Sequence, residues 1–152
     1  MNSTVSIQFH YINQRFYFPH RNRLKDFLFL LLKNEGKTLD AINVIFCDDA
    51  YLLALNQEYL DHDTYTDIIT FELSEPSVPL LSDIFISVER VKSNALELGV
   101  SFQQELHRVI FHGFLHLCGY QDKAATARDI MRKKESDYLR AYFVPRGTTK
   151  TF

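Results

Sequence analysis

Residues 101–118 constrain the fold of this chain most strongly, because they predict a helix with apolar side chains on two sides. Ser101 and Gln104 have the spacing of a capping box at its start, and Gly119 stands where a helix-ending glycine is expected. The apolar positions are Leu106, Val109, Ile110, Gly113 and Leu117 on one face, and Phe111 and Leu115 on the other. Such a helix needs cover on both sides, so we expect it to lie buried between two layers of structure.

The rest of the sequence alternates between short β-branched or aromatic stretches and longer amphipathic ones. Strands are predicted over residues 5–11, 41–47, 66–73 and 82–88, with residues 15–18 extending the first strand or pairing with it. Helices are predicted over residues 21–35, 50–60, 88–98, 101–118 and 123–142. The third and fourth strands are candidates for a hairpin with a long loop. This pattern predicts an α+β fold with about four strands in one sheet and about five helices around it.

Length and charge limit the class of protein. The chain has 152 residues, of which 46% are hydrophobic, and this predicts one domain over residues 1–152 with a frayed tail over residues 145–152. A net charge of −2 means that any contact with nucleic acid must be local. No secretory signal is visible, and the longest apolar run, residues 27–32, is far below the ~20 residues of a membrane span. We therefore expect a cytoplasmic protein that does not enter a membrane.

Two histidines in the predicted central helix have the spacing of metal ligands. His112 and His116 are four positions apart, which places them about 40° apart around the helix axis and about 6 Å apart along it. Gly119 is expected to reverse the chain and return Asp122 toward both histidines. The set of His112, His116 and Asp122 then binds one divalent ion, most simply zinc, and leaves a fourth position for water, as in catalytic sites.

Neighbouring residues leave alternatives open. Asp122 can instead cap the last helix, and Cys118 is a further candidate ligand that points away from the histidines. Glu105 lies on the same line of the helix two turns earlier, where it either orients a ligand or is a surface or capping glutamate. Gly113 costs about 1 kcal/mol in mid-helix, which indicates a packing or functional reason for it. It also replaces the general base of His-Glu-x-x-His metalloproteases, which disfavours a peptidase.

A nine-residue run beginning at His112 resembles the signature of the YbeY family of bacterial endoribonucleases and ribosomal RNA maturation factors. Its matching positions are His112, Gly113, Leu115, His116, Leu117, Gly119 and Tyr120. Further matches over most of the chain are Asn56, Tyr59, Asp63, Thr66, Asp67, Phe71, Asp83 and Ile84. The resemblance implies a small mixed sheet with surrounding helices, one zinc-like ion and cleavage of RNA with a preference for single strands. It also implies maturation of the 3′ end of small-subunit ribosomal RNA, ribosome quality control, and the small subunit as a partner.

Three positions depart from the family pattern. Asp122 stands where the family usually has a third histidine, and a carboxylate is an acceptable but harder zinc ligand. Leu60 stands where the family usually has an arginine suited to contact phosphate, and Ser82 replaces a glycine. The missing arginine favours an alternative function, a non-catalytic ribosome-assembly factor whose metal only holds the end of the helix in place.

The expected activity is that of a zinc-dependent endoribonuclease that acts on single-stranded or ribosomal RNA and not on DNA. Asp67 and Glu105 are candidates to assist proton transfer, but no catalytic residue is assigned. Candidate phosphate contacts are Arg21, Arg23 and Lys25 on the first helix, and Arg128, Arg132, Lys133 and Lys134 on the last, although both groups are also typical of a solvated face. The apolar stripe predicted for the last helix comprises Ala127, Ile130, Met131, Tyr138, Ala141 and Tyr142. The oligomeric state is not predicted.

Overall fold

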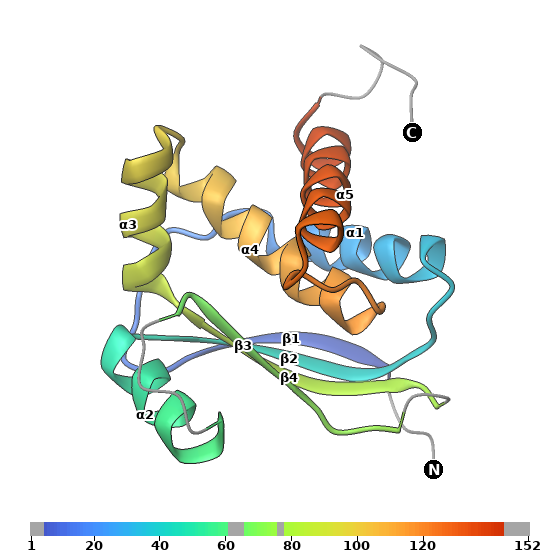
Figure 1. The fold of residues 1–152 in the computed structure, drawn as a ribbon, viewed down its shortest axis with the longest axis horizontal. Helices are drawn as coiled ribbons and strands as arrows, with labels where there is room; N and C mark the ends of the chain where they lie inside the picture. The colour runs from blue at the N-terminus through green and yellow to red at the C-terminus, as the bar shows by residue number, and fades with distance from the viewer. Residues whose placement is uncertain (1–4, 61–65, 76–77, 145–152) are drawn as a thin grey trace.

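The computed structural model describes residues 5–60, 66–75 and 78–144 (Figure 1). Its elements are β1 (Ser6–Tyr11), α1 (Arg21–Asn34), β2 (Leu39–Cys47), α2 (Asp49–Leu60), β3 (Ile68–Glu72), β4 (Leu80–Ser87), α3 (Val88–Leu98), α4 (Phe102–Leu117) and α5 (Ala125–Phe143). The strands form one sheet in the order β1-β2-β4-β3, with β1, β2 and β4 parallel and β3 antiparallel to β4. The predicted α+β class, mixed four-stranded sheet and hairpin are confirmed. The expected tail at 145–152 and Asp63 lie outside the described residues.

The helices cover the two faces of the sheet unequally (Figure 1). Helices α1, α4 and α5 lie over one face, and α2 lies against the other. The main core includes Leu28 of α1 with Val44 and Phe46 of β2, and a smaller cluster under α2 contains Leu52 and Ile69. None of the helices in the part of the chain that the structure describes has the length and hydropathy of a membrane span.

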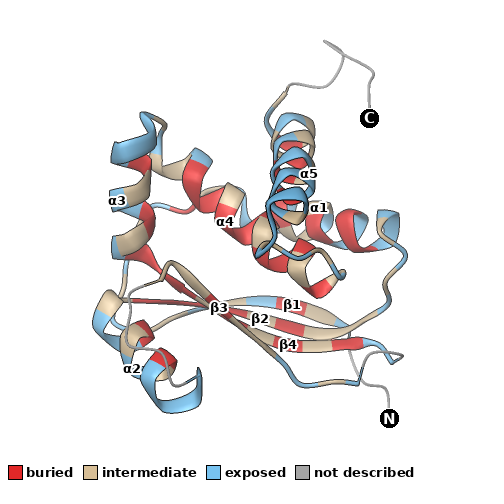
Figure 2. Cartoon of the chain, in the orientation of Figure 1, coloured by how far each residue is buried: buried red, intermediate tan, exposed pale blue. Residues whose placement is uncertain are grey.

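Helix α4 is buried along most of its length, as its two apolar faces predict (Figure 2). Gly113 lets it approach the sheet closely, since a Cβ atom there would lie 2.8 Å from Cδ1 of Ile68 and 3.4 Å from two atoms of Ile84. The expected packing reason for this glycine is therefore present. The close approach places the histidine-bearing turns of α4 directly against β3 and β4.

Residues 15–18 do not form a strand, so that prediction is wrong. Asn13 has a φ of 54° and turns the chain at the end of β1. The segment then runs unpaired, although Phe16 and Phe18 still pack against the main core. Its aromatic alternation reflects this packing and not a strand ladder.

The buried stripe of α5 differs from the predicted one, and Ala127 and Ala141 are only half-buried. Met131, Tyr138 and Tyr142 are buried as predicted, but Ile130 is 49% exposed. Glu135 is buried in the stripe, with only 3% of its surface exposed. At 3.6 residues per turn, positions 131, 135, 138 and 142 share one face, whereas position 130 is turned away from it. A carboxylate therefore lies in the interface between α5 and α4.

Candidate functional site

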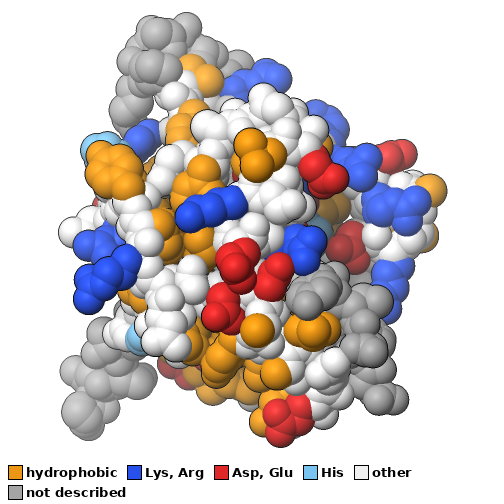
Figure 3. Space-filling view, turned by 90° about the vertical axis from the view of Figure 1, so that its left-hand side faces the viewer, with side chains coloured by type: hydrophobic (Ala, Val, Ile, Leu, Met, Phe, Trp, Pro, Cys, Tyr) orange, Lys and Arg blue, Asp and Glu red, His pale blue; other side chains and the backbone are white. Residues whose placement is uncertain are grey.

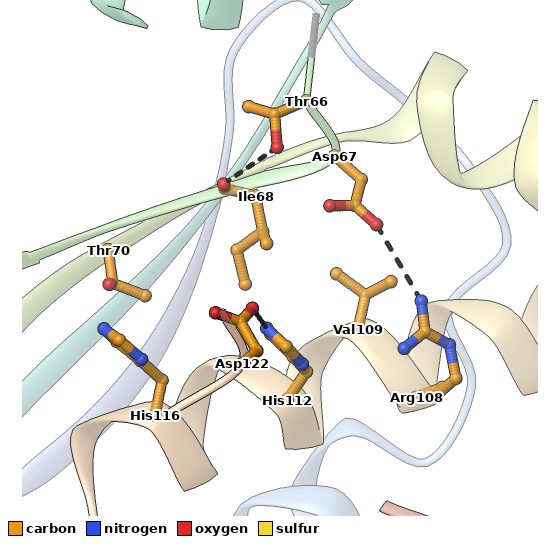
Figure 4. A pocket seen from close by; sticks show the side chains of 9 residues that line it. All are labelled: Thr66, Asp67, Ile68, Thr70, Arg108, Val109, His112, His116 and Asp122. Atoms are coloured by element: carbon orange, nitrogen blue, oxygen red, sulfur yellow. Dashed lines mark hydrogen bonds and ion pairs between the residues drawn. The ribbon is translucent and has the colours of Figure 1, made fainter. Parts of the chain in front are cut away.

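A cavity of about 270 Å³ lies between α4 and the start of β3 (Figure 4). Its lining residues are Thr66, Asp67, Ile68, Thr70, Arg108, Val109, His112, His116 and Asp122. All three residues predicted as metal ligands thus face one cavity. The strand β3 and the residues just before it supply the opposite wall, including the carboxylate of Asp67.

The turn after α4 brings Asp122 back as the sequence predicts. Gly119 has a φ of 108°, and the N–H groups of Gly119 and Tyr120 donate to carbonyls of the last helical turn. The carboxylate of Asp122 then lies 3.2 Å from Nε2 of His112. Helix α5 has Ala124 at its N-cap with no side-chain cap, so the alternative role of Asp122 as that cap is wrong.

Both histidines are held through their Nδ1 atoms. Nδ1 of His112 lies 2.6 Å from Oε2 of Glu135, and Nδ1 of His116 lies 3.2 Å from the carbonyl oxygen of Tyr120. Because a carbonyl only accepts, the Nδ1–H of His116 is the donor, and a carboxylate partner assigns the same role to Nδ1 of His112. In both rings Nδ1 is thus occupied, and Nε2 of His112 faces the carboxylate of Asp122 in the cavity. This arrangement is typical of metal-binding histidines, whose second nitrogen is fixed by an outer hydrogen bond.

The donor set fits a zinc-like ion in its chemistry. Two neutral imidazole nitrogens and one carboxylate are ordinary ligands of catalytic zinc. Within residues 5–60, 66–75 and 78–144, no three His, Cys, Asp or Glu side chains already lie at the spacing that holds a metal. The contact between His112 and Asp122 is direct, whereas His116 shares the cavity with them.

A charged network lies behind the histidines and centres on Arg108. Its guanidinium donates two hydrogen bonds of 2.8 Å to Glu105 and one of 2.9 Å to Glu135, and it lies 3.8 Å from Asp67. Glu105 is 1% exposed, so its interpretation as a surface or capping glutamate is wrong. Glu135 joins the network to the candidate site, because its other oxygen holds His112.

Two residues of this network, Arg108 and Glu135, were not predicted from the sequence. Arg108 follows the first apolar positions of α4 and has no distinctive motif of its own. Glu135 did leave a signal, since it is an acidic residue four positions after Met131 and three before Tyr138, on the buried stripe of α5. A carboxylate at such a position needs a buried partner.

The network shifts the ionisation of the residues around the cavity. Burial lowers the pKa of His112, but the hydrogen bond and charge of Glu135 and the charge of Asp122 outweigh this and raise the pKa above its usual value. Burial raises the pKa of Asp67, and the charges of Arg108 and His112 only partly oppose the change. Hydrogen bonds to Glu105 raise the pKa of Arg108, which therefore stays cationic. Asp67 therefore holds a proton more readily than an exposed aspartate does.

A second cluster, centred on Glu35, holds the turn after α4, and this turn contains the carbonyl group that binds His116. The carboxylate of Glu35 accepts hydrogen bonds from the hydroxyls of Tyr120 at 2.8 Å and Tyr138 at 2.6 Å, and from Lys134 at 3.2 Å. Tyr120 is also the residue whose carbonyl holds His116. The end of α1, helix α5 and the turn after α4 are therefore joined at one carboxylate.

Comparison with known proteins places this geometry in a family. The family model of the endoribonuclease YbeY matches residues 13–143. The chain belongs to this family. It is 44% identical over 138 residues to the endoribonuclease YbeY of Flavobacterium johnsoniae, which covers 91% of this chain and 98% of that protein. It is 46% identical over 119 residues to the endoribonuclease YbeY of Cytophaga hutchinsonii, covering 78% and 83%.

A solved structure has a similar fold. The solution structure of TM1509 from Thermotoga maritima is similar with a TM-score of 0.63 and 25% identity, over 95% of this chain and 100% of that one. The α+β fold is therefore shared beyond the sequence relatives.

The positions that depart from the YbeY pattern have distinct surroundings. Leu60, at the end of α2, is 43% exposed and is not among the residues that line the cavity. Ser82 is buried and its hydroxyl donates to the carbonyl of Phe71 at 2.8 Å, so it ties β4 to β3.

Cys118, the alternative metal ligand, does not line the cavity. Burial raises the pKa of its thiol to about 12, which makes it a poor ligand.

Proposed function

We propose that this protein is a metal-dependent endoribonuclease, with His112, His116 and Asp122 holding one divalent ion of the zinc type. The observation that carries the proposal is the cavity itself, which collects these three side chains and fixes both imidazoles through Nδ1. Family membership supplies the reaction class, because the matched relatives are named as endoribonucleases.

The ion would supply the chemistry that the side chains lack. When bound, a zinc-type ion polarises a phosphate oxygen and lowers the pKa of water. A bound cation would also offset the negative charge of Asp122, which would otherwise repel the phosphodiester. His112, His116 and Asp122 bind the ion, and Glu135 keeps the ring of His112 in place.

Two further side chains have chemical roles in this proposal. Asp67 reaches the cavity from the β3 side, opposite the histidines, and takes up or returns a proton during cleavage (Figure 4). Glu105 is unsuited to that role, because both of its oxygens are bonded to Arg108. Arg108 has five N–H donors, of which three are used by the two glutamates, so it retains donors for a phosphate oxygen. It offers at the cavity N–H donors that Leu60 cannot.

Cleavage of a single-stranded RNA tests the proposal. Metal-loaded protein should cut a labelled oligonucleotide, and a chelator or the substitution His116→Ala should remove the cutting. A His10→Ala variant is a matched control, because His10 is an exposed histidine on β1, outside the cavity. Retention of full cleavage by His116→Ala would contradict the proposal.

A non-catalytic ribosome-assembly factor is the second candidate. The observation in its favour is Leu60, which leaves the position of the family's arginine without charge. Bound metal and association with the small ribosomal subunit, without any RNA cutting, would select this candidate. Cleavage of peptides without cleavage of RNA would select a peptidase instead.

The cellular role follows from the resemblance to the YbeY family. We propose that the protein acts as one domain in the cytoplasm, on the 3′ end of small-subunit ribosomal RNA and in ribosome quality control. Accumulation of unprocessed small-subunit RNA in a deletion strain would support this role, and normal processing would contradict it.

A further inference from the structure

A second cavity, of about 800 Å³, lies beyond the end of β1 and shares no lining residue with the first. Its lining residues are Tyr11, Asn13, Gln14, Arg15, Phe16, Tyr17, Phe18 and Arg21. Two of these eight residues are arginines and none is acidic, whereas the candidate metal cavity contains Asp67 and Asp122 beside its one arginine, Arg108. The charge of this second cavity is therefore suited to an anion without the help of a metal.

Local charge matters here because the molecule has no extended positive field. The net charge is −2, and the face shown in Figure 3 mixes basic, acidic and apolar side chains. The basic side chains predicted on α5 are partly used elsewhere, because Lys133 and Lys134 form ion pairs with carboxylates. The arginines of the second cavity form no ion pair within the described residues.

Aromatic packing and one hydrogen bond hold the segment that lines this cavity against the core. Phe16 and Phe18 point into the core, where their ring centroids are 5.6 Å apart, and Arg15 and Tyr17 alternate with them on the outside. The side-chain amide of Gln103 on α4 donates to the carbonyl of Tyr17 at 2.6 Å. The outward side chains are therefore presented by an anchored segment, so binding orders little additional chain.

The exposed side chains of this cavity are an aromatic ring and two arginines. Tyr17 is 78% exposed, which is an unusually high exposure for a large aromatic side chain. Arg21 is oriented by a hydrogen bond of 3.1 Å to the hydroxyl of Tyr11, and Arg15 is exposed on the same segment as Tyr17. Aromatic rings that stack on bases and arginines that contact phosphates are the two components of single-strand nucleic-acid sites.

We propose that this cavity is a second RNA site, which binds an unpaired segment of the RNA through Tyr17, Arg15 and Arg21. The proposal deepens the proposed function, since it takes RNA as the ligand from there. An acidic peptide would satisfy the arginines but would leave Tyr17 without a base to stack on, so RNA is the better match.

Binding to a fluorescent single-stranded oligonucleotide tests this site in the presence of a chelator, which keeps the RNA uncut. Tyr17→Ala should weaken binding about 5- to 150-fold, as expected for the loss of one stacked base. The double variant Arg15→Ala/Arg21→Ala should also reduce the slope of log affinity against log salt by about 1.4, or about 0.7 for each phosphate that is no longer neutralised. The control pair Lys33→Ala/Lys92→Ala, exposed on α1 and α3 and outside both cavities, should bind like the wild type.

The outcomes separate this site from the proposed activity. With metal restored, the cavity variants should keep kcat at saturating RNA and show a raised KM. If the wild type binds RNA but does not cut it, and the variants lose binding, the second site stands and the proposed function fails. Wild-type RNA affinity in both cavity variants would overturn the second site. Equal binding of a labelled oligoglutamate, abolished in the same variants, would overturn RNA as its ligand and indicate a protein partner.

Discussion

Oε2 of Glu135 lies 2.6 Å from Nδ1 of His112, and Oε1 of the same carboxylate lies 2.9 Å from Nη1 of Arg108. One buried side chain of α5 thus orients a candidate ligand on α4 and neutralises the cation beside it. The candidate site therefore depends on the packing of these two helices as well as on the histidine motif.

Removing the charge of Glu135 should weaken the metal site. In Glu135→Gln an amide oxygen can still accept from Nδ1 of His112, but the imidazole loses a charged partner. Metal affinity measured by isothermal titration calorimetry should fall about 10- to 100-fold. Asp137→Asn is the control, because Asp137 is a more exposed acid on the same helix. Unchanged zinc affinity in Glu135→Gln would contradict the orienting role.

Adding a methyl group at Gly113 should push α4 away from the sheet. The new Cβ would lie 2.8 Å from Cδ1 of Ile68, and the crowding outweighs the gain in helix propensity. The free energy of unfolding of Gly113→Ala should fall by about 1–2 kcal/mol in urea denaturation. Ile68→Val removes the crowded Cδ1 atom. The double variant Gly113→Ala/Ile68→Val should therefore lose less free energy of unfolding than the sum of the losses in the two single variants. Strict additivity would show that the contact does not limit the approach of the helix.

His107 should make the folded state less stable in mild acid. Burial lowers its pKa and the charge of Arg23 adds to this, against the hydrogen bond to the carbonyl of Gln103. The folded state keeps His107 neutral, while the unfolded chain binds a proton below about pH 6.5. His107 therefore has no effect on stability well above that pH and lowers stability as the pH falls, by at most about 1.4 kcal/mol for each pH unit.

Urea denaturation at pH 7.5 and pH 5.5 measures this effect. The difference between the two pH values should be smaller in His107→Gln than in the wild type, whatever the absolute stability of the variant. The comparison isolates His107, because the other titrating groups are present in both proteins. An identical difference in both would mean that His107 is protonated as readily in the folded state as in the unfolded chain.

Features that depend on neighbouring residues were predictable from the sequence. Ser101 caps α4 by accepting from the N–H of Gln104, and Gly119 reverses the chain as its position predicts. The return of Asp122 toward His112 follows from that local turn. The two apolar faces of α4 likewise predict its burial between the sheet and the helices above it.

Features that depend on distant residues were not predictable in the same way. Arg108 and Glu135 are 27 positions apart and meet only because α5 packs on α4. The order of the strands, with β4 between β2 and β3, also has no signal in the local pattern. The strand predicted at residues 15–18 is absent, because the aromatic alternation there serves core packing.

The central claim is that His112, His116 and Asp122 together bind one metal ion, and the metal content of purified protein tests it most directly. Elemental analysis and zinc titration should show one ion for each wild-type chain and a strong loss in His112→Ala, His116→Ala and Asp122→Ala, with His10→Ala unchanged. A wild-type protein that binds no divalent ion, or an Asp122→Ala variant that binds it as tightly as the wild type, would contradict the account.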